Sequence, residues 1–444
     1  MFSERIELLD GYIKCNPIFL IVDIILIVHF FVTWYTKYLK TGLKLSYWHF
    51  FIFRNFFIQF LLLYPFNSSI KNVVSFGSNI IAAERFIDTA FIVTCLGYVS
   101  ILFGTWIKQN QQSYILRIGI IISFERFIET NIKSRFTFYL IVSLAIGLLI
   151  FMFSHTLGTK YLFSPRNYFM GNKDARPIYS MLLSVYPIAV VFSGLRVIQL
   201  NTSNSKYIFF ILLVFSFFLG TRISTIEPIT LLFLFYYMKN YKSVSLKNIL
   251  IVFVSLVGLM LIISSLRSGK NEDALTEILY GNHFSDTRDF AFLLAYFHDQ
   301  WLLGKSYLAG MMTFIPRQYS DFRENWAFGL YCARLVGIHD PLFPGHRPGY
   351  FGEIFMNFSY YGVVILGIWT GIVIQHIDNK IMQEFKNGCN VIKMYSYTFV
   401  AFFATTLSIS LIFTQFYTFL VAMLFLAFLR HLGSFGQDLY HGKR

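Results

Sequence analysis

The sequence predicts an all-α polytopic membrane protein with about eleven transmembrane helices and one large, partly helical loop outside the membrane. Of the 444 residues, 56% are hydrophobic and only 14% are charged, and the mean hydropathy is +0.58. This composition excludes water-soluble enzymes, disordered chains and secreted disulfide scaffolds. Since one crossing needs about 20 apolar residues, the chain has room for all these spans and one sizeable loop.

Apolar runs between helix breakers give the expected spans, each long enough to cross a bilayer if the helix is tilted. They lie at residues 17–36, 47–66, 86–107, 136–155, 177–195, 206–221, 223–238, 248–266, 353–374, 395–411 and 413–429. At three places the sequence can be divided into spans in another way. The junction at 220–223 is short, residues 113–124 also fit an interfacial or re-entrant helix, and the continuous run 395–429 need not be two helices.

Basic residues set the predicted orientation, because loops on the cytoplasmic side of a membrane carry an excess of Lys and Arg. The cytoplasmic set comprises Lys37, Lys40, Lys44, Lys108, Arg117, Arg126, Lys133, Arg135, Arg196, Lys206, Lys239, Lys242, Lys247, Lys380, Lys386, Lys393, Arg430, Lys443 and Arg444. An odd number of spans then places the N-terminus outside. The net charge of +14 follows from this orientation, so we expect no nucleic-acid partner.

The spans divide the chain into an N-terminal transmembrane bundle (1–266), a large external loop (267–350), and C-terminal transmembrane helices with a cytoplasmic tail (351–444). The external loop is too long for a mere connector, so we expect function there. Helix signals in the loop, followed by a Pro- and Gly-rich stretch before the next span, predict a folded cap.

External arginines adjoin apolar or Gly/Pro-rich segments at the expected membrane face. The segments are Gly220-Thr221-Arg222, Ile315-Pro316-Arg317 and Arg347-Pro348-Gly349, and Arg288 lies in the same large loop. Guanidinium groups bind a diphosphate well, because they grip its oxygens bidentately and stay charged when partly desolvated. The alternative for each arginine is a solvated side chain or a contact with a lipid headgroup.

Two groups at the end of the external loop fit acid–base chemistry. A neutral His346 imidazole can accept the proton of a sugar hydroxyl, and Glu353, which opens the ninth span, fits a base or a partner of Arg347. The alternatives are a surface histidine in a turn and a carboxylate stabilised by the first turn of its helix. The loop has no HExxH motif and no well-aligned set of ligands, so we predict no metal site.

Charged residues also lie inside the spans. Asp23 and Arg54 fall in the first two predicted helices. Because intramembrane ions are costly and normally paired, we expect these two to neutralise each other. The alternative is a role in moving a solute across the membrane.

Short elements in the last third of the chain carry a resemblance to a known family. Residues 304–320 read GKSYLAGMMTFIPRQYS, and residues 346–371 read HRPGYFGEIFMNFSYYGVVILGIWTG. With their Ile-Pro-Arg, Gly-Glu and Asn-Phe elements they resemble the oligosaccharide repeat unit polymerases, the Wzy-type O-antigen polymerases. Gly220-Thr221-Arg222 is similar to a Gly-x-Arg element between two middle helices of that family. Ser359 stands where the family usually has Gly, and Phe322-Arg323-Glu324 lies where a Lys-Pro pair often follows Ile-Pro-Arg.

The resemblance implies a fold similar to the GT-C membrane glycosyltransferases and a reaction at the periplasmic face of the bacterial inner membrane. A glycan would pass from undecaprenyl pyrophosphate to a sugar hydroxyl of another lipid-linked repeat, with no metal or cofactor. On this reading Arg317, Arg347, Arg222 and Arg288 hold the diphosphate. Glu353 or His346 would activate the acceptor, and Asn357 would orient a sugar or brace the loop.

The resemblance also implies a polysaccharide chain-length regulator as a partner, beside the lipid bilayer and the lipid-linked substrates. Two other functions fit the same sequence. An O-antigen ligase would transfer the glycan to lipid A core, and a lipid-linked oligosaccharide flippase or another transporter would use the intramembrane charges as a path. The sequence shows no duplicated halves of the kind common in transporters, which favours chemistry at one face.

Overall fold

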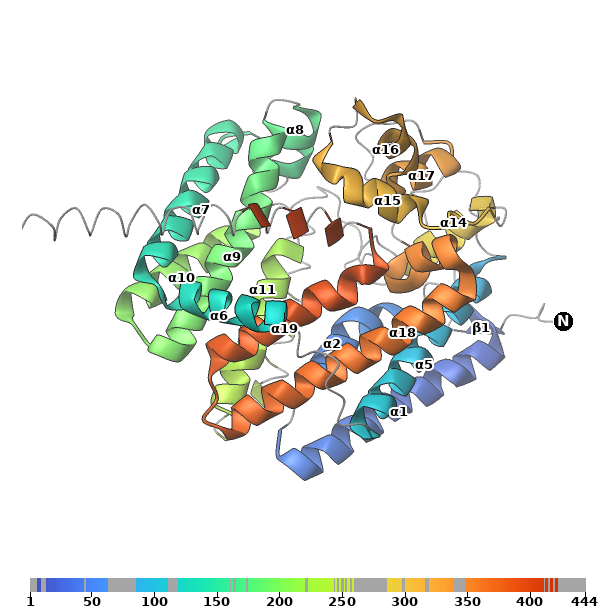
Figure 1. The fold of residues 1–444 in the computed structure, drawn as a ribbon, viewed down its shortest axis with the longest axis horizontal. Coiled ribbons are helices and arrows are strands. Elements are labelled where there is room, and N and C mark those ends of the chain that lie inside the picture. Colours follow the sequence, from blue (N-terminus) through green and yellow to red (C-terminus); the bar gives the residue numbers. More distant parts are fainter. Residues whose placement is uncertain are drawn as a thin grey trace, which may run out of the picture.

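The structure is a computed structural model of the chain. It describes residues 6–8, 13–43, 45–62, 85–110, 119–159, 161–162, 165–172, 175–219, 223–242, 286–297, 300–315, 319–338 and 348–410, with isolated positions in 244–258 and 412–421. A short antiparallel ribbon of β1 (Ile6–Leu8) and β2 (Ile13–Cys15) opens the chain. The other described residues form helices and the turns between them (Figure 1).

Among the described residues, 5 helices are long and apolar enough to cross a membrane. They are α1 (Pro17–Thr41), α5 (Ile87–Asn110), α7 (Arg135–Thr156), α9 (Arg176–Leu200) and α18 (Gly349–Lys386). Shorter apolar helices are α10 (Ser203–Ser216), α11 (Ile223–Lys239) and α19 (Val391–Thr405). The prediction of a helical membrane protein is confirmed, while the larger number of spans stays a prediction.

Several predicted spans differ from the helices. The second is α2 (Tyr47–Ile52), which continues as the π-helix η1 (Phe53–Leu62). The sixth ends in a 3-10 turn, η4 (Phe217–Leu219). Residues 113–124, for which the sequence also fits an interfacial or re-entrant helix, overlap α6 (Gly119–Lys133), a separate helix before α7. Most of 248–266 and of 413–429 lies outside the described residues.

Basic side chains tie several helix ends together at one end of the bundle. Lys37 of α1 forms an ion pair with the buried Asp378 of α18, which also accepts a hydrogen bond from the Trp48 amide at 3.1 Å. The Arg196 Nη1 atom of α9 donates to the last carbonyl groups of α6, 2.9 Å from the Ile132 oxygen. Lys239 of α11 donates to the Ile198 carbonyl near the end of α9. Charges that the sequence assigned to one side therefore gather at one end.

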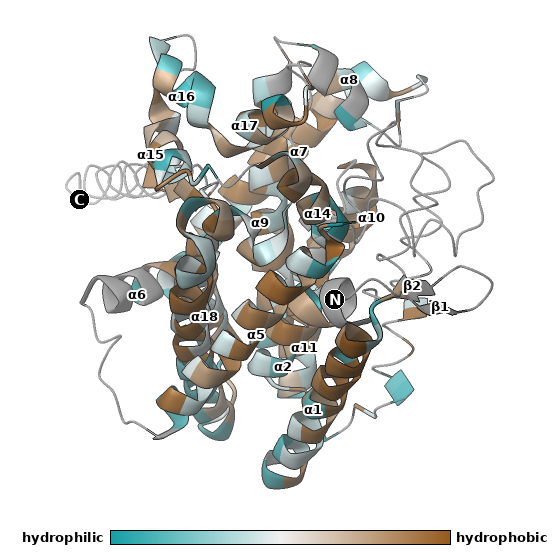
Figure 2. Ribbon diagram, turned by 90° about the vertical axis from the view of Figure 1, so that its right-hand side faces the viewer, coloured by the Kyte–Doolittle hydropathy of each residue, from teal (hydrophilic) through white to brown (hydrophobic). Residues whose placement is uncertain are grey.

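The helices of the predicted external loop lie at the opposite end of α18, and we call them the cap (Figure 2). The cap comprises α14 (Asp286–Phe297), α15 (Lys305–Met311) with the 3-10 turn η5 (Met312–Phe314), α16 (Asp321–Trp326) and α17 (Phe328–Leu335). Helix α14 packs on the start of α18, with the Phe290 and Phe355 rings 5.8 Å apart.

Helices α5 and α18 pack very closely, and glycine makes this contact possible. A Cβ atom on Gly104 would lie 2.1 Å from the Ile368 carbonyl oxygen, and one on Gly371 would lie 2.1 Å from the Ile101 carbonyl oxygen. Both neighbours are backbone atoms, which cannot rotate away. Small residues allow such close approach in membranes, where helix association depends on van der Waals packing.

The expected ion pair between Asp23 and Arg54 does not form. Asp23 is buried on α1, and its Oδ1 atom accepts no hydrogen bond, whereas Arg54 on η1 is exposed. The π-helical winding of η1 alters the direction in which its side chains point relative to an α-helix. The sequence pattern assumed ordinary helical geometry.

The α5–α18 contact predicts a strong effect of one added methyl group. Gly104→Ala should lower the free energy of unfolding by about 2–3 kcal/mol, because the helices must separate to admit the Cβ atom. The matched control is Gly147→Ala on α7, where nothing lies within 4 Å of the added atom. The control should be neutral or stabilising by up to about 1 kcal/mol.

Thermal unfolding in detergent measures the effect. A fluorogenic maleimide reports the unfolding, because it reacts with the buried thiols of Cys15 and Cys332 when they become exposed. Equal midpoints for the two variants would contradict the close approach of α5 and α18.

Candidate functional site

Helix α18 is broken beneath the cap. Phe358 and Ser359 have non-helical backbone angles, with φ −133° and ψ 17° at Phe358 and φ 57° and ψ −157° at Ser359. A break leaves carbonyl groups without their helical partners. The loop before α15 supplies donors here: the Leu302 amide donates to the Met356 oxygen at 3.0 Å, and the Leu303 amide donates to the Asn357 oxygen at 3.2 Å. The break is therefore part of the fold's hydrogen bonding.

Ser359 occupies a backbone region that is essentially restricted to glycine. With a positive φ and a ψ near −160°, a Cβ atom is strained by about 1–3 kcal/mol. This gives a physical reason for the glycine that stands at the matching position of the family resembled by the sequence. The chain keeps the break although its serine is a poor fit.

The Asn357 side chain fixes the start of α15. It is fully buried, and its Oδ1 atom accepts from the Gly304 amide at 3.0 Å. Its Nδ2 atom donates to the Ser306 hydroxyl at 2.9 Å and to the Glu353 carbonyl at 2.8 Å. Gly304 has φ 85°, which allows the chain to turn sharply into the helix. One amide group thus joins the broken helix to the cap.

Glu353 joins three segments of the chain and is only 2% exposed. One carboxylate oxygen accepts from the Ser306 hydroxyl at 2.7 Å, and the other accepts from the Ser410 amide at 3.0 Å. Ser410 follows η7 (Thr406–Ser408), the 3-10 turn after α19. Within the described residues Glu353 forms no ion pair, so these hydrogen bonds compensate its burial.

Neutral polar groups of the cap surround this carboxylate. Burial raises the pKa of the Tyr307 phenol, and the nearby Glu353 carboxylate raises it further. Burial also raises the pKa of the Cys332 thiol on α17, with a smaller contribution from Glu353. Both groups therefore stay protonated at neutral pH, and neither is a nucleophile in this state.

Arg288 lies on α14 and is almost completely buried. Burial lowers the pKa of its guanidinium, and the adjacent Asp289 carboxylate acts in the opposite direction. Arginine nevertheless stays charged in proteins. Helix α14 packs on the half of α18 that carries Glu353, so a buried positive charge lies in the cap on the helix beside Glu353.

The structure brings some of the predicted site residues together. Glu353 and Asn357 share the Ser306 hydroxyl, and Arg288 lies on the helix packed beside them. The other predicted site residues lie outside the described residues: Arg222, Arg317, His346 and Arg347. In the described part of the chain, no group of three or more His, Cys, Asp and Glu side chains is placed to hold a metal ion.

Sequence reasoning missed three contributors to this site. Ser306 lies in the segment that carries the family resemblance, but no pattern singled out its hydroxyl. Ser410 contributes a backbone amide, which no side-chain pattern reveals. Arg323 donates through Nη1 to the Ile315 carbonyl, at the last residue of the described segment 300–315.

Comparisons of the chain with models of protein families, with curated protein sequences and with solved structures found no match.

The shared hydroxyl predicts a specific loss of stability. Ser306→Ala removes a donor to Glu353 and an acceptor of Asn357, so the free energy of unfolding should fall by about 1–3 kcal/mol. The matched control is Ser184→Ala on α9, an exposed serine whose hydroxyl only donates to the Ser180 carbonyl of its own helix. Thermal unfolding in detergent measures both, and a Ser306 effect no larger than the control's would rule out the network.

The strain at Ser359 predicts that a glycine there makes the protein more stable. Ser359→Gly should raise the free energy of unfolding by about 1 kcal/mol or more, because glycine adopts this backbone conformation without a Cβ clash. Ser359→Ala serves as the control, since it removes the hydroxyl but keeps the Cβ atom. If the glycine variant is no more stable than the alanine variant, α18 does not break at this residue.

Proposed function

We propose that this protein is an O-antigen polymerase, a membrane glycosyltransferase that joins undecaprenyl-pyrophosphate-linked repeat units at the periplasmic face of the inner membrane. One observation carries the proposal. The two segments that resemble the family contact each other directly, although Ser306 and Glu353 are 47 residues apart in the sequence. They form one buried hydrogen-bonded unit. It lies at the opposite end of the bundle from Lys37, Arg196 and Lys239, which mark the basic end.

The proposed reaction is a displacement at the anomeric carbon of the donor sugar. The bond between that carbon and the diphosphate oxygen breaks, and a new bond forms to the hydroxyl oxygen of the acceptor. The hydroxyl proton goes to a base, and undecaprenyl diphosphate leaves. Because diphosphate is already a good leaving group, the main need is for cations that neutralise its charge. Arg317, Arg347, Arg222 and Arg288 are the residues we assign to this task.

Glu353 has a defined part in this proposal. Both of its carboxylate oxygens accept hydrogen bonds, so it can act as a base only if Ser306 or Ser410 releases one of them. In the arrangement described, it positions α15, which leads through η5 to the Ile315-Pro316-Arg317 element. Asn357 braces the same helix. His346 is the second candidate for the base.

The proposal is tested by an in-frame deletion in the source strain, complemented in turn by variants and analysed on a lipopolysaccharide gel. Loss of a polymerase leaves a single repeat on the lipid A core, whereas loss of a ligase leaves bare core. Arg317→Lys keeps the charge but loses the guanidinium fork, so we expect the polymerisation rate to fall on the order of 10²- to 10³-fold. Arg135→Lys, an exposed residue at the basic end, is the control.

Protein levels must be equal in all strains. Chains of normal length in the Arg317→Lys and Arg317→Ala strains would remove Arg317 from the site. A ladder that is unchanged by the deletion itself would remove the proposed function altogether.

Transport is a second candidate, because Asp23 is buried inside α1 and one of its oxygens lacks a hydrogen-bond donor. Intramembrane carboxylates of this kind often belong to a transport pathway. Purified protein in vesicles would then move a labelled lipid-linked repeat across the bilayer without forming a dimer of repeats. Dimer formation without translocation would favour the polymerase.

A further inference from the structure

Helix α15 and η5 expose a row of large apolar side chains, although they belong to the hydrophilic loop of the sequence. Leu308 is 50% exposed, Met311 44% and Phe314 69%. Their spacing of three residues places them along one side of the helical segment. The other side, with Ser306, Ala309 and Gly310, is buried. Water is a poor environment for such a face, which the described part of the chain leaves largely uncovered.

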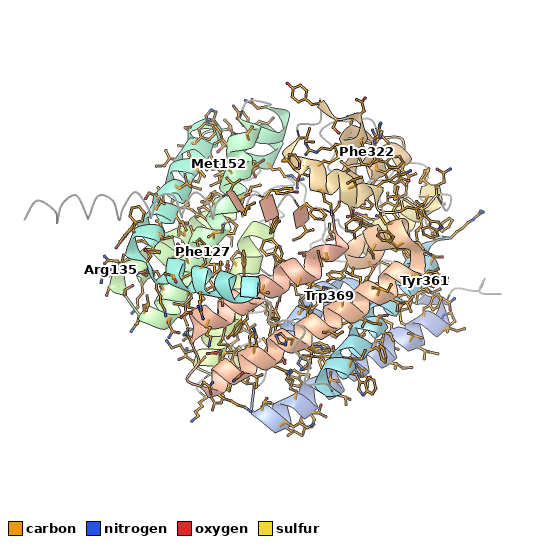
Figure 3. All side chains as sticks on the ribbon, viewed as in Figure 1. Phe127, Arg135, Met152, Phe322, Tyr361 and Trp369 are labelled. Atoms are coloured by element: carbon orange, nitrogen blue, oxygen red, sulfur yellow. The ribbon has the colours of Figure 1, made fainter. Side chains whose placement is uncertain are left out.

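One end of this row continues onto α18. Leu303, just before α15, is 74% exposed, and its amide donates to the Asn357 carbonyl at the helix break. Phe358 packs beside Tyr307, with ring centres 6.1 Å apart, and is itself exposed. Tyr361 and Ile365, one turn apart on α18, are also exposed, and Figure 3 shows Tyr361 on this helix below the cap. Because α18 is long and apolar enough to span a membrane, this stripe faces lipid.

The other end of the row meets the last apolar run of the sequence. The Tyr417 hydroxyl donates to the Met311 carbonyl at 2.9 Å, and the Phe314 and Tyr417 rings meet edge to face at 5.7 Å. Leu420 and Val421, which follow in the same run, are exposed. The apolar face of α15 therefore bridges two segments of membrane-spanning composition.

From this continuity we infer that α15 and η5 lie in the outer part of the bilayer, with Leu308, Met311 and Phe314 among the lipid acyl chains. Short amphipathic segments bind membranes in this way, with the apolar face buried about 5–10 Å into the interface. Lys305 begins the helix, and its ammonium lies 4.2 Å from the centre of the Trp326 ring, so its charge can remain at the level of the headgroups.

The next helix of the cap has the opposite character. On α16, Asp321, Glu324 and Asn325 are exposed. Charged and polar side chains of this kind belong in water. The surface of the cap therefore changes from apolar on α15 to polar on α16. The membrane contact follows from the apolar surface alone and does not depend on which reaction the protein catalyses.

The test measures how deep single positions lie in the membrane. Leu308→Cys and Phe314→Cys are labelled with an environment-sensitive fluorophore in vesicles of zwitterionic phospholipid that contain spin-labelled lipid. Ile365→Cys on α18 is the lipid-facing reference, and Glu324→Cys on α16 is the control in water. The unsubstituted protein, labelled in parallel, gives the background from its own cysteines.

We expect the spin-labelled lipid to quench the labels at 308 and 314 as it quenches the label at 365, and about twofold or more above the label at 324. Aqueous iodide should quench only the label at 324. Iodide quenching at 308 and 314 equal to that at 324 would overturn the inference and place α15 in water. Protection from both quenchers would overturn it too, since another protein or a second copy would then cover the face.

Discussion

The structure depends on a break in helix α18, because the break leaves backbone groups that need new partners. Where α18 departs from helical geometry at Phe358 and Ser359, carbonyl groups lose their helical donors, and a buried carbonyl without a donor is costly. Leu302 and Leu303 supply donors from the cap, and the Asn357 side chain completes the join by binding the Gly304 amide. The break therefore fixes where the cap attaches and in which direction α15 leaves the bundle.

The rest of the molecule holds this junction in place from both sides. Glycines let α5 lie against the membrane-spanning half of α18, so that half has little freedom to shift. At the far end, Asp378 forms an ion pair with Lys37 and accepts a hydrogen bond from the Trp48 amide. These contacts join α1 and α2 to the same helix. Glu353 performs the equivalent task at the cap, with serine partners in place of a cation. A carboxylate thus lies near each end of α18, and each joins segments that are distant in the sequence.

The function proposed above requires a polar site beside an apolar surface, because the proposed substrate joins a diphosphate to a hydrocarbon chain. The buried polar network of Ser306, Glu353 and Asn357 lies on one side of α15, and the other side of that helix exposes apolar side chains. Ile315 follows η5, and Arg323 donates a hydrogen bond to its carbonyl. Asn357 and Glu353 thus set the position of α15, the helix that precedes the Ile-Pro-Arg element in the sequence.

The apolar runs alone predict the class of the protein, because about 20 consecutive apolar residues are the signature of a membrane-spanning helix. The basic pattern also assigned Lys37, Arg196 and Lys239 to one side, and these three gather at one end of the bundle. Short motifs pointed to Glu353 and Asn357. The sequence pattern missed the π-helical winding of η1, and with it the absence of an Asp23–Arg54 pair, since residue spacing indicates an ion pair only if the helices are regular. The partners of Glu353 became evident only from the folded chain, because a hydroxyl and a backbone amide from distant segments have no signature along the sequence. The tertiary structure also decided that part of a loop classed as hydrophilic has an apolar face, since exposure depends on which side of α15 is packed against its neighbours.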